Sequence, residues 1–165
     1  MKRVLSFLLP VFLVCLLCAC DPPPAMGDHL GYQQGPYRME AVAEGAETVR
    51  FVAESDGETF VFRPIGEGTE AFSFTVSGEE LFLCCEDLRI PLSPEAGHLA
   101  AAVYRMMTLD ASGLWQITEE TRDGGAVICC DSEDIRLELD KKTGFPVRIA
   151  GEGIEVRVSG FEMRN

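Results

Sequence analysis

Residues 135–159, IRLELDKKTGFPVRIAGEGIEVRVS, decide the fold class of this chain of 165 residues. Apolar and polar residues alternate over 135–139 and again over 154–158, and Thr143-Gly144 supplies a turn between the two runs. A period of two is the pattern of a strand with one apolar and one solvated face. Glycine turns between such runs indicate antiparallel pairing. The stretch therefore predicts antiparallel strands.

The same pattern extends outward over the chain from Tyr37 onward. Residues 72–76 and 115–117 alternate in the same way. Glycine-containing turns recur at Asp56-Gly57, Gly66 to Gly68, Ser77-Gly78 and Asp123 to Gly125. Short alternating segments separated by such turns are typical of an antiparallel meander. The sequence therefore predicts a mainly β fold.

One helix is predicted to interrupt the strands, from Pro94 to about Leu109. Ser93 is a good N-cap, and Pro94 is a good residue for the first turn of a helix. An apolar stripe at helical spacing follows, made of Leu99, Val103, Met106 and Met107. Small side chains at 100–102 let the helix lie close to a sheet. We therefore expect it to cover the sheet.

The amino terminus has the three-part order of an export signal. Lys2 and Arg3 precede an apolar stretch from Val4 to Leu17, and Leu17-Cys18-Ala19-Cys20 follows. The segment resembles a bacterial lipoprotein signal. That resemblance implies that residues 1–19 are cleaved off.

The resemblance also implies that Cys20 carries the lipid. A transmembrane anchor is the alternative, and it needs about 20 apolar residues to cross the hydrocarbon core. The apolar stretch is shorter, contains Pro10 and ends before Pro22-Pro23-Pro24, through which no helix continues. We therefore expect a protein anchored by its lipid on the extracytoplasmic face of the cell membrane.

After Cys20 the sequence predicts a tether and one domain. Residues 20–36 comprise the lipidated cysteine and a segment rich in Pro and Gly, which indicates a flexible spacer. Residues 37–165 are long enough for a single domain with its own core. The formal net charge is −13 even with Lys2 and Arg3 included. Such acidity repels phosphate backbones and anionic headgroups, so we expect no nucleic-acid partner and attachment through the lipid alone.

Several short motifs occur in a recognisable order around the predicted helix. Strands at 72–76 and 81–83 precede it, and Gly113-Leu114-Trp115 begins the strand after it. Leu139-Asp140 and Thr143-Gly144-Phe145-Pro146 mark a turn between two late strands. In this order the chain resembles the LolA-like lipoprotein-carrier superfamily, especially its small bacterial lipoprotein members of the clostridial type.

The resemblance covers roughly Tyr37 to Glu162, and it implies the architecture. A curved antiparallel sheet, or incomplete β-barrel, would surround an apolar concavity covered by a helix. The family usually has an amphipathic helix before the first strand, where this chain has only its Pro- and Gly-rich segment. Part of the lid is therefore expected to be missing. We therefore expect a protein that stays anchored to the membrane rather than a soluble carrier that transports lipoproteins.

Apolar residues of the predicted strands and helix are candidates for lining the concavity. They are Phe72, Phe74, Val103, Met106, Met107, Leu137, Leu139, Val156 and Val158. In a closed core these side chains would fill the interior, whereas in a half-barrel they would line a ligand site. Flexible thioethers such as those of Met106 and Met107 suit acyl chains of variable shape.

Two vicinal cysteine pairs, Cys84-Cys85 and Cys129-Cys130, lie in predicted strands. They could be small buried hydrophobes, or one bridge could join them if the strands are neighbours. Metal or redox chemistry is the third alternative. Consecutive strand residues point to opposite faces, which opposes convergence of four sulfurs on a metal. We therefore expect no metal site and no cofactor.

Catalytic residues are not expected. His29 lies in the predicted spacer and His98 near the start of the predicted helix, and neither belongs to a nucleophile or metalloprotease motif.

The leading hypothesis is a non-enzymatic lipoprotein that binds a lipid or a lipidated segment. The alternative is an envelope interaction or regulatory lipoprotein with a filled core that binds a protein partner. A third is a thiol-based redox factor. An apolar pocket of several hundred Å³ favours the first.

Overall fold

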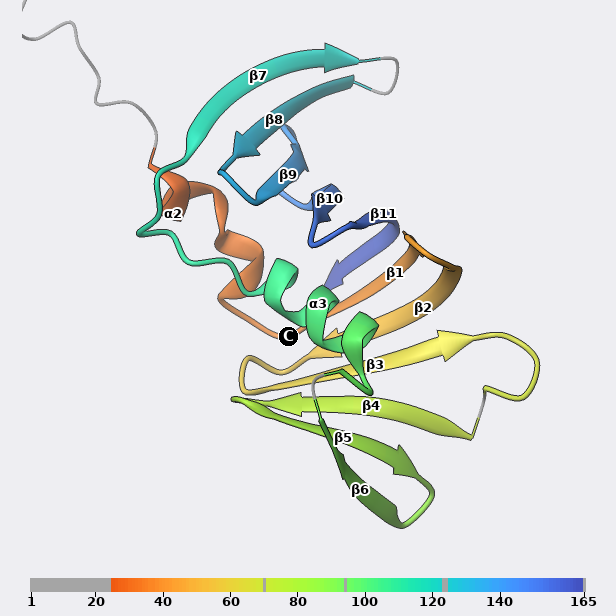
Figure 1. Cartoon of the computed structure of the whole chain (residues 1–165). Helices are drawn as coiled ribbons and strands as arrows, with labels where there is room; N and C mark the ends of the chain where they lie inside the picture. Colours follow the sequence, from red (N-terminus) through yellow and green to blue (C-terminus); the bar gives the residue numbers. More distant parts are fainter. Residues whose placement is uncertain (1–24, 70, 94, 123–124, 165) are drawn as a thin grey trace, which may run out of the picture.

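The structure is a computed structural model that describes residues 25–69, 71–93, 95–122 and 125–164. One antiparallel sheet of eleven strands curves around the helix α3 (Figure 1). The strands are β1 (Tyr37–Glu44), β2 (Thr48–Ser55), β3 (Thr59–Ile65), β4 (Phe72–Ser77), β5 (Glu80–Cys85), β6 (Leu88–Leu92), β7 (Gln116–Arg122), β8 (Gly125–Asp131), β9 (Ile135–Asp140), β10 (Pro146–Gly151) and β11 (Ile154–Met163). The helices are α2 (Met26–His29), the 3₁₀ turn η1 (Gly31–Gln33) and α3 (His98–Met107). The predicted fold class, mainly β with one covering helix, is confirmed.

The sheet is built from two meanders joined at its centre. The strand order is β6-β5-β4-β3-β2-β1-β11-β10-β9-β8-β7, so the first and last strands of the chain pair with each other. A register shift between Glu40 and Ala41 accommodates one extra residue, Ser159, in β11. Its hydroxyl donates to the carbonyl oxygen of Glu40 (3.0 Å). β6 and β7 are the two free edges, so the sheet curves without closing.

Helix α3 lies on the concave face because the chain must cross from one free edge to the other. It follows β6 and leads towards β7, at the opposite edge of the sheet (Figure 1). Its small residues Ala100 and Ala102 are buried, as a close approach to the sheet requires. None of the described helices is long and apolar enough to span a bilayer.

The helix begins later than the sequence predicts. Its N-cap is Gly97, and the N–H groups of Ala96 and Gly97 donate to the carbonyl of Ser93 in a preceding turn (3.0 and 3.4 Å). Gly97 lies directly on β5, since a Cβ at that position would come 2.2 Å from Cδ2 of Leu81. The prediction that Ser93 caps the helix is therefore wrong, because contact with β5 decides where it starts. Pro94 lies outside the described residues.

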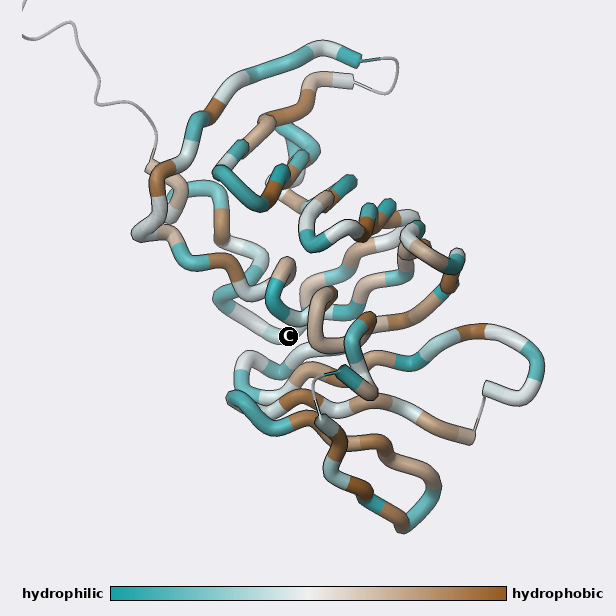
Figure 2. The backbone as a smooth tube through the Cα atoms, in the orientation of Figure 1, coloured by the Kyte–Doolittle hydropathy of each residue, from teal (hydrophilic) through white to brown (hydrophobic). Residues whose placement is uncertain are grey.

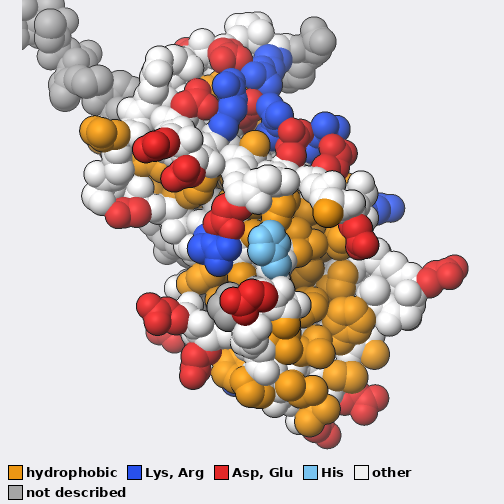
Figure 3. Space-filling model, in the orientation of Figure 1, with side chains coloured by type: hydrophobic (Ala, Val, Ile, Leu, Met, Phe, Trp, Pro, Cys, Tyr) orange, Lys and Arg blue, Asp and Glu red, His pale blue; other side chains and the backbone are white. Residues whose placement is uncertain are grey.

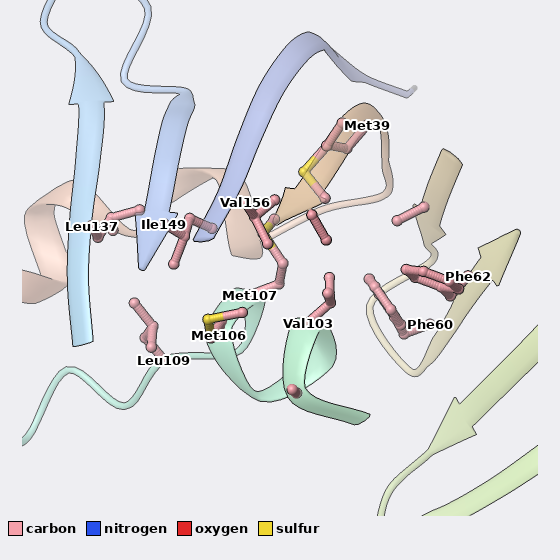
Figure 4. Packing of buried hydrophobic residues seen from close by; sticks show 14 of the residues in the cluster. Met39, Phe60, Phe62, Val103, Met106, Met107, Leu109, Leu137, Ile149 and Val156 are labelled. Atoms are coloured by element: carbon pink, nitrogen blue, oxygen red, sulfur yellow. The ribbon is translucent and has the colours of Figure 1, made fainter. Parts of the chain in front are cut away.

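The core is filled where α3 meets β1 and β9–β11. Val103 and Met106 of α3 point towards the strands that carry Leu137, Ile149 and Val156 (Figure 4). All five side chains are completely buried. The largest fully buried side chains in this region are Met39, Val103, Met106, Met107, Leu137, Leu139, Pro146, Ile149 and Val156, while Phe51, Phe60 and Phe62 are buried on β2 and β3. This half of the concavity is therefore a packed core.

The segment before β1 also packs against the domain. Met26 of α2, Tyr32 of η1 and Leu30, which lies between the two elements, are buried. The side-chain amide of Gln33 donates to the backbone carbonyl of Met107, at the end of α3 (2.9 Å). The prediction of a flexible spacer is thus wrong for 25–36, and these residues cover the end of the concave face that was expected to lack a lid. The signal, Cys20 and residues 21–24 lie outside the described residues.

Among the described residues, one carboxylate is buried on the convex face, that of Glu138 of β9, whose side chain is only 4% exposed. It accepts hydrogen bonds from Arg122 Nη1 (2.9 Å), Arg136 Nε (3.0 Å) and Arg148 Nη1 (3.0 Å). Basic and acidic side chains gather around β8–β10 (Figure 3). Because the three arginines come from β7, β9 and β10, the cluster ties neighbouring strands together.

Candidate ligand-binding groove

A groove of about 650 Å³ opens between the start of α3 and the concave face of β2–β4. Its described lining residues are Gly45, Ala46, Glu47, Val49, Phe62, Pro64, Thr69, Phe72, Phe74, Glu95, Ala96, Gly97, His98, Leu99, Ala100, Glu152, Gly153 and Ile154. A continuous hydrophobic surface is visible beside the start of α3 (Figure 3). The groove exists because α3 covers the centre of the concave face and leaves the strands towards β6 open.

Aromatic side chains form the floor of the groove. Phe62 of β3 stacks on Phe51 of β2, with ring centroids 4.5 Å apart. Phe74 of β4 meets Phe62 edge to face at 6.1 Å, and Phe72 meets Phe74 at 5.9 Å. The register places Phe62 opposite Phe74, which puts both rings on the concave face. Alternating phenylalanines on adjacent strands therefore build one continuous apolar floor.

The apolar floor continues beyond the groove to the free edge at β6. The register of β4, β5 and β6 aligns their inward-facing residues in three rows, Phe72-Cys85-Leu88, Phe74-Leu83-Ile90 and Val76-Leu81-Leu92. All nine side chains are apolar. Leu88 is 58% and Ile90 39% exposed. The hydropathy of the chain shows the same hydrophobic character in the β5–β6 hairpin (Figure 2).

The rim of the groove carries carboxylates. Glu152, in the turn between β10 and β11, accepts two hydrogen bonds from the Arg105 guanidinium, one of them at 2.8 Å. This contact lowers the pKa of Glu152. Glu95 precedes α3, and the hydroxyl of Ser93 lowers its pKa. Glu47 extends from the β1–β2 turn. Both Glu95 and Glu152 are therefore ionised at neutral pH.

The nine residues predicted to line the concavity fall into two groups. Phe72 and Phe74 line the groove. Val103, Met106, Met107, Leu137, Leu139 and Val156 are fully buried in the packed core, and Val158 is half-buried against it. Alternation identifies inward-facing residues in both groups equally. For the residues of the sheet, what separates the two groups is whether α3 covers them, and this depends on the path of the chain from β6 to β7.

Other lining residues were not predicted. Phe62 and Val49 lie on the concave face, and Leu99 borders the groove from α3. Leu99 belongs to the predicted apolar stripe of the helix but not to the buried face of α3. An apolar residue of the stripe that the core does not cover was therefore the available signal for this position. Ala46 and Glu47 lie in a turn, and sequence periodicity carries no signal for turn residues at a groove.

The two cysteine pairs lie at opposite ends of the sheet. Seven strands separate β5, which carries Cys84 and Cys85, from β8, which carries Cys129 and Cys130. The condition for a bridge between the pairs is therefore not met, and all four thiols are free. As predicted, each pair lies in a strand, and its members point to opposite faces of the sheet.

The thiols of β8 are buried and poorly suited to nucleophilic chemistry. Burial raises the pKa of Cys130 to about 11 and also raises that of Cys129. Cys129 lies 3.5 Å from Nη2 of Arg136 on the convex side. A raised pKa leaves little thiolate at neutral pH, so these residues behave as small hydrophobes. In the part of the chain that the structure describes, no group of three or more His, Cys, Asp or Glu side chains could hold a metal ion.

Comparisons with known proteins identify similar folds. No protein-family model and no curated protein matches the chain. An uncharacterized conserved protein from Thermus thermophilus is 11% identical, with a TM-score of 0.56 over 85% of this chain and 86% of that one. At this identity the likeness shows the fold alone.

Two further solved structures are more distant. A LolA superfamily protein from Nitrosomonas europaea is 12% identical, with a TM-score of 0.43 over 86% of this chain and 94% of that one. The Mycobacterium tuberculosis lipoprotein LppX is 13% identical, with a TM-score of 0.43 over 85% and 94%. The open, curved antiparallel sheet with a helix on its concave face is the architecture implied by the LolA-like resemblance of the sequence.

Proposed function

We propose that this protein is a membrane-anchored bacterial lipoprotein that binds a hydrophobic ligand, a lipid or a lipidated segment, without catalysing a reaction. The observation that carries the proposal is the groove of about 650 Å³ with its aromatic floor. Small-molecule sites commonly enclose roughly 300–1,000 Å³ and are lined mainly by apolar side chains. The volume and lining of the groove fit that class.

The aromatic floor supplies the binding energy in this proposal. Burial of apolar surface contributes about 25 cal/mol per Å². Phe72 and Phe74 are only half-buried in the structure, so a ligand can still remove part of each side chain from water. An acyl chain makes no demand for hydrogen-bond partners, and the floor offers none. The groove is therefore suited to a chain of methylene groups.

Anchoring through Cys20 is the second part of the proposal. Five residues lead from Cys20 to Ala25, where the described chain begins. Such a segment spans at most about 18 Å. The domain would therefore sit close to the bilayer with α2 nearest the anchor. The groove is lined by the start of α3, which is the end of that helix away from α2 (Figure 1). Incorporation of labelled palmitate into the wild type and its loss in Cys20→Ser would test this part.

Native mass spectrometry of the mature protein from its host membrane tests ligand binding. Ala96 is exposed and lines the groove, so Ala96→Trp should fill the site at little cost in stability. Ala126→Trp is the matched control, because Ala126 is exposed on β8 near the other edge of the sheet. We expect a non-covalent ligand on the wild type and on Ala126→Trp and none on Ala96→Trp. Retention by Ala96→Trp would contradict the proposal.

A protein partner is the second candidate function. Leu88 and Ile90 are exposed on β6, a free edge whose backbone groups could pair with another strand. Crosslinking from an introduced Leu88→Cys, compared with Leu114→Cys at an exposed position outside the groove, would identify such a partner. Absence of any ligand on the wild-type protein, together with specific crosslinking at position 88, would favour this candidate.

A further inference from the structure

The groove is apolar on its floor and acidic at its rim, and the rim restricts the ligand. Among its described lining residues are three carboxylates, Glu47, Glu95 and Glu152, but neither lysine nor arginine. His98 is the remaining titratable side chain of the lining. An amphiphile that lays its chain on the floor can place its head group against this rim.

Two of the three carboxylates are not neutralised by the protein. Glu152 is paired with Arg105, a residue of α3 that does not line the groove. Neither Glu47 nor Glu95 forms an ion pair with any residue that the structure describes. The two come from different walls, the β1–β2 turn and the segment before α3. The mouth of the groove therefore carries uncompensated negative charge on two sides.

We propose, resting on the proposed function above, that the groove selects an amphiphile with a cationic head group, which lies between Glu47 and Glu95 while the chain covers the phenylalanine floor. An anionic head would meet the carboxylates of Glu47 and Glu95, and Arg105, the arginine beside the rim, is already paired with Glu152. An uncharged head gains neither attraction nor repulsion. Both carboxylates are exposed, and an ion pair at an exposed position changes a binding constant by a modest factor. Two such pairs predict about a five- to twentyfold preference for a cationic over an anionic head group.

The general acidity of the chain is a second source of attraction for cations and must be separated from the rim. The chain carries a formal charge of −13. Exposed charges more distant than about 8 Å are largely screened at about 0.15 M salt. Measurements at this ionic strength therefore reduce the contribution of the distant surface and retain that of the two rim carboxylates.

Competition by three ligands with the same dodecyl chain tests the proposal. Dodecylammonium, dodecanol and dodecanoate are titrated against the uncharged fluorescent probe N-phenyl-1-naphthylamine bound to the full mature chain, at neutral pH. The two charged ligands are kept below their micellar concentrations and dodecanol below its solubility. We expect affinity to fall in that order, with about a five- to twentyfold difference between the first and the last. The Glu47→Gln/Glu95→Gln double variant should reduce the difference to about twofold. Glu133→Gln, which removes an exposed charge from the β8–β9 turn, should leave it unchanged.

The outcomes separate this proposal from the one on which it rests. Equal binding of the three ligands, or tighter binding of dodecanoate, would overturn the head-group selectivity and leave ligand binding in the groove intact. A preference that survives in the double variant would also overturn it, because the charge responsible would lie elsewhere. Failure of the probe and of all three ligands to bind would contradict the proposed function itself.

Discussion

Replacement of Met106 by alanine distinguishes the filled core from the open groove. Met106 is fully buried on α3, and its sulfur lies beside β10, where a Cβ at Gly151 would be 3.5 Å from Sδ. Met106 does not line the groove. The substitution should therefore lower the free energy of unfolding without changing the affinity of the folded protein for a hydrophobic probe.

The size of the loss follows from the atoms removed. Truncation deletes Cγ, Sδ and Cε, and each buried methylene equivalent contributes about 0.8 kcal/mol, which gives a transfer cost of about 2 kcal/mol. Incomplete collapse of the cavity adds about 1–2 kcal/mol. We expect a total loss of about 3–4 kcal/mol. A domain of ordinary stability has only about 5–15 kcal/mol in all.

Urea unfolding measures this loss, and Trp115 reports it. This residue is the only tryptophan of the chain, packs against the core and donates its Nε1–H to the carbonyl of Asp110 (3.1 Å). Leu114→Ala is the control, because Leu114 is 96% exposed and its truncation should cost less than about 0.5 kcal/mol. A loss below about 1 kcal/mol for Met106→Ala, or a weaker affinity of its folded fraction, would refute the assignment of Met106 to a filled core.

Three further predictions concern the charged cluster and the thiols. Glu138→Ala should lower the free energy of unfolding by about 2–4 kcal/mol, because three guanidiniums lose a buried partner, whereas Glu133→Ala should have almost no effect; urea unfolding would decide. Arg148 and Arg157 lower the pKa of Glu155 from 4.5 to about 2, so the stability that this carboxylate contributes is complete above about pH 4.5 and is lost as the pH falls towards 2. The difference in unfolding free energy between wild type and Glu155→Gln should accordingly shrink over that range, and a difference independent of pH would contradict it. Native alkylation at pH 8, followed by peptide mass spectrometry, should label Cys130 far more slowly than after unfolding, and equal rates would show that the thiol is accessible.

Strand alternation predicted the fold well because it reports which face of a sheet a side chain occupies. Leu137 and Leu139 are buried as their alternation requires, and Phe72 and Phe74 share the concave face. The turns and the helical stripe gave the right elements in the right order. Alternation carries no information about how far the helix extends over the sheet, so it could not separate core from groove.

The errors arose where distant contacts override local signals. Ser93 is a strong capping residue, yet the helix starts after Gly97, where it rests on Leu81 of β5. The residues before β1 look like a spacer by composition, yet Met26 and Tyr32 are buried beside the end of α3. In both cases the deciding contact joins segments that are separated in the sequence: β5 with the start of α3, and the residues before β1 with the end of α3.

The buried carboxylate on the convex face illustrates the same limit. Glu138 alternates with leucines and was assigned to the solvated face, which is the correct side of the sheet. Its burial depends on Arg122 and Arg148, which belong to other strands. Alternation gives the face of a residue, but only the strand order shows what covers it.

The pairing of β1 with β11 makes assembly of this protein a late event. β1 lacks one of its two neighbours until the last strand, Ile154–Met163, has been synthesised. Before then the first meander exposes an unpaired edge beside an apolar face, the combination that promotes pairing between chains. A chain that ends before residue 154 would keep β1 as an unpaired edge between its two meanders. Such fragments should aggregate or be degraded rather than persist as a half-sized domain.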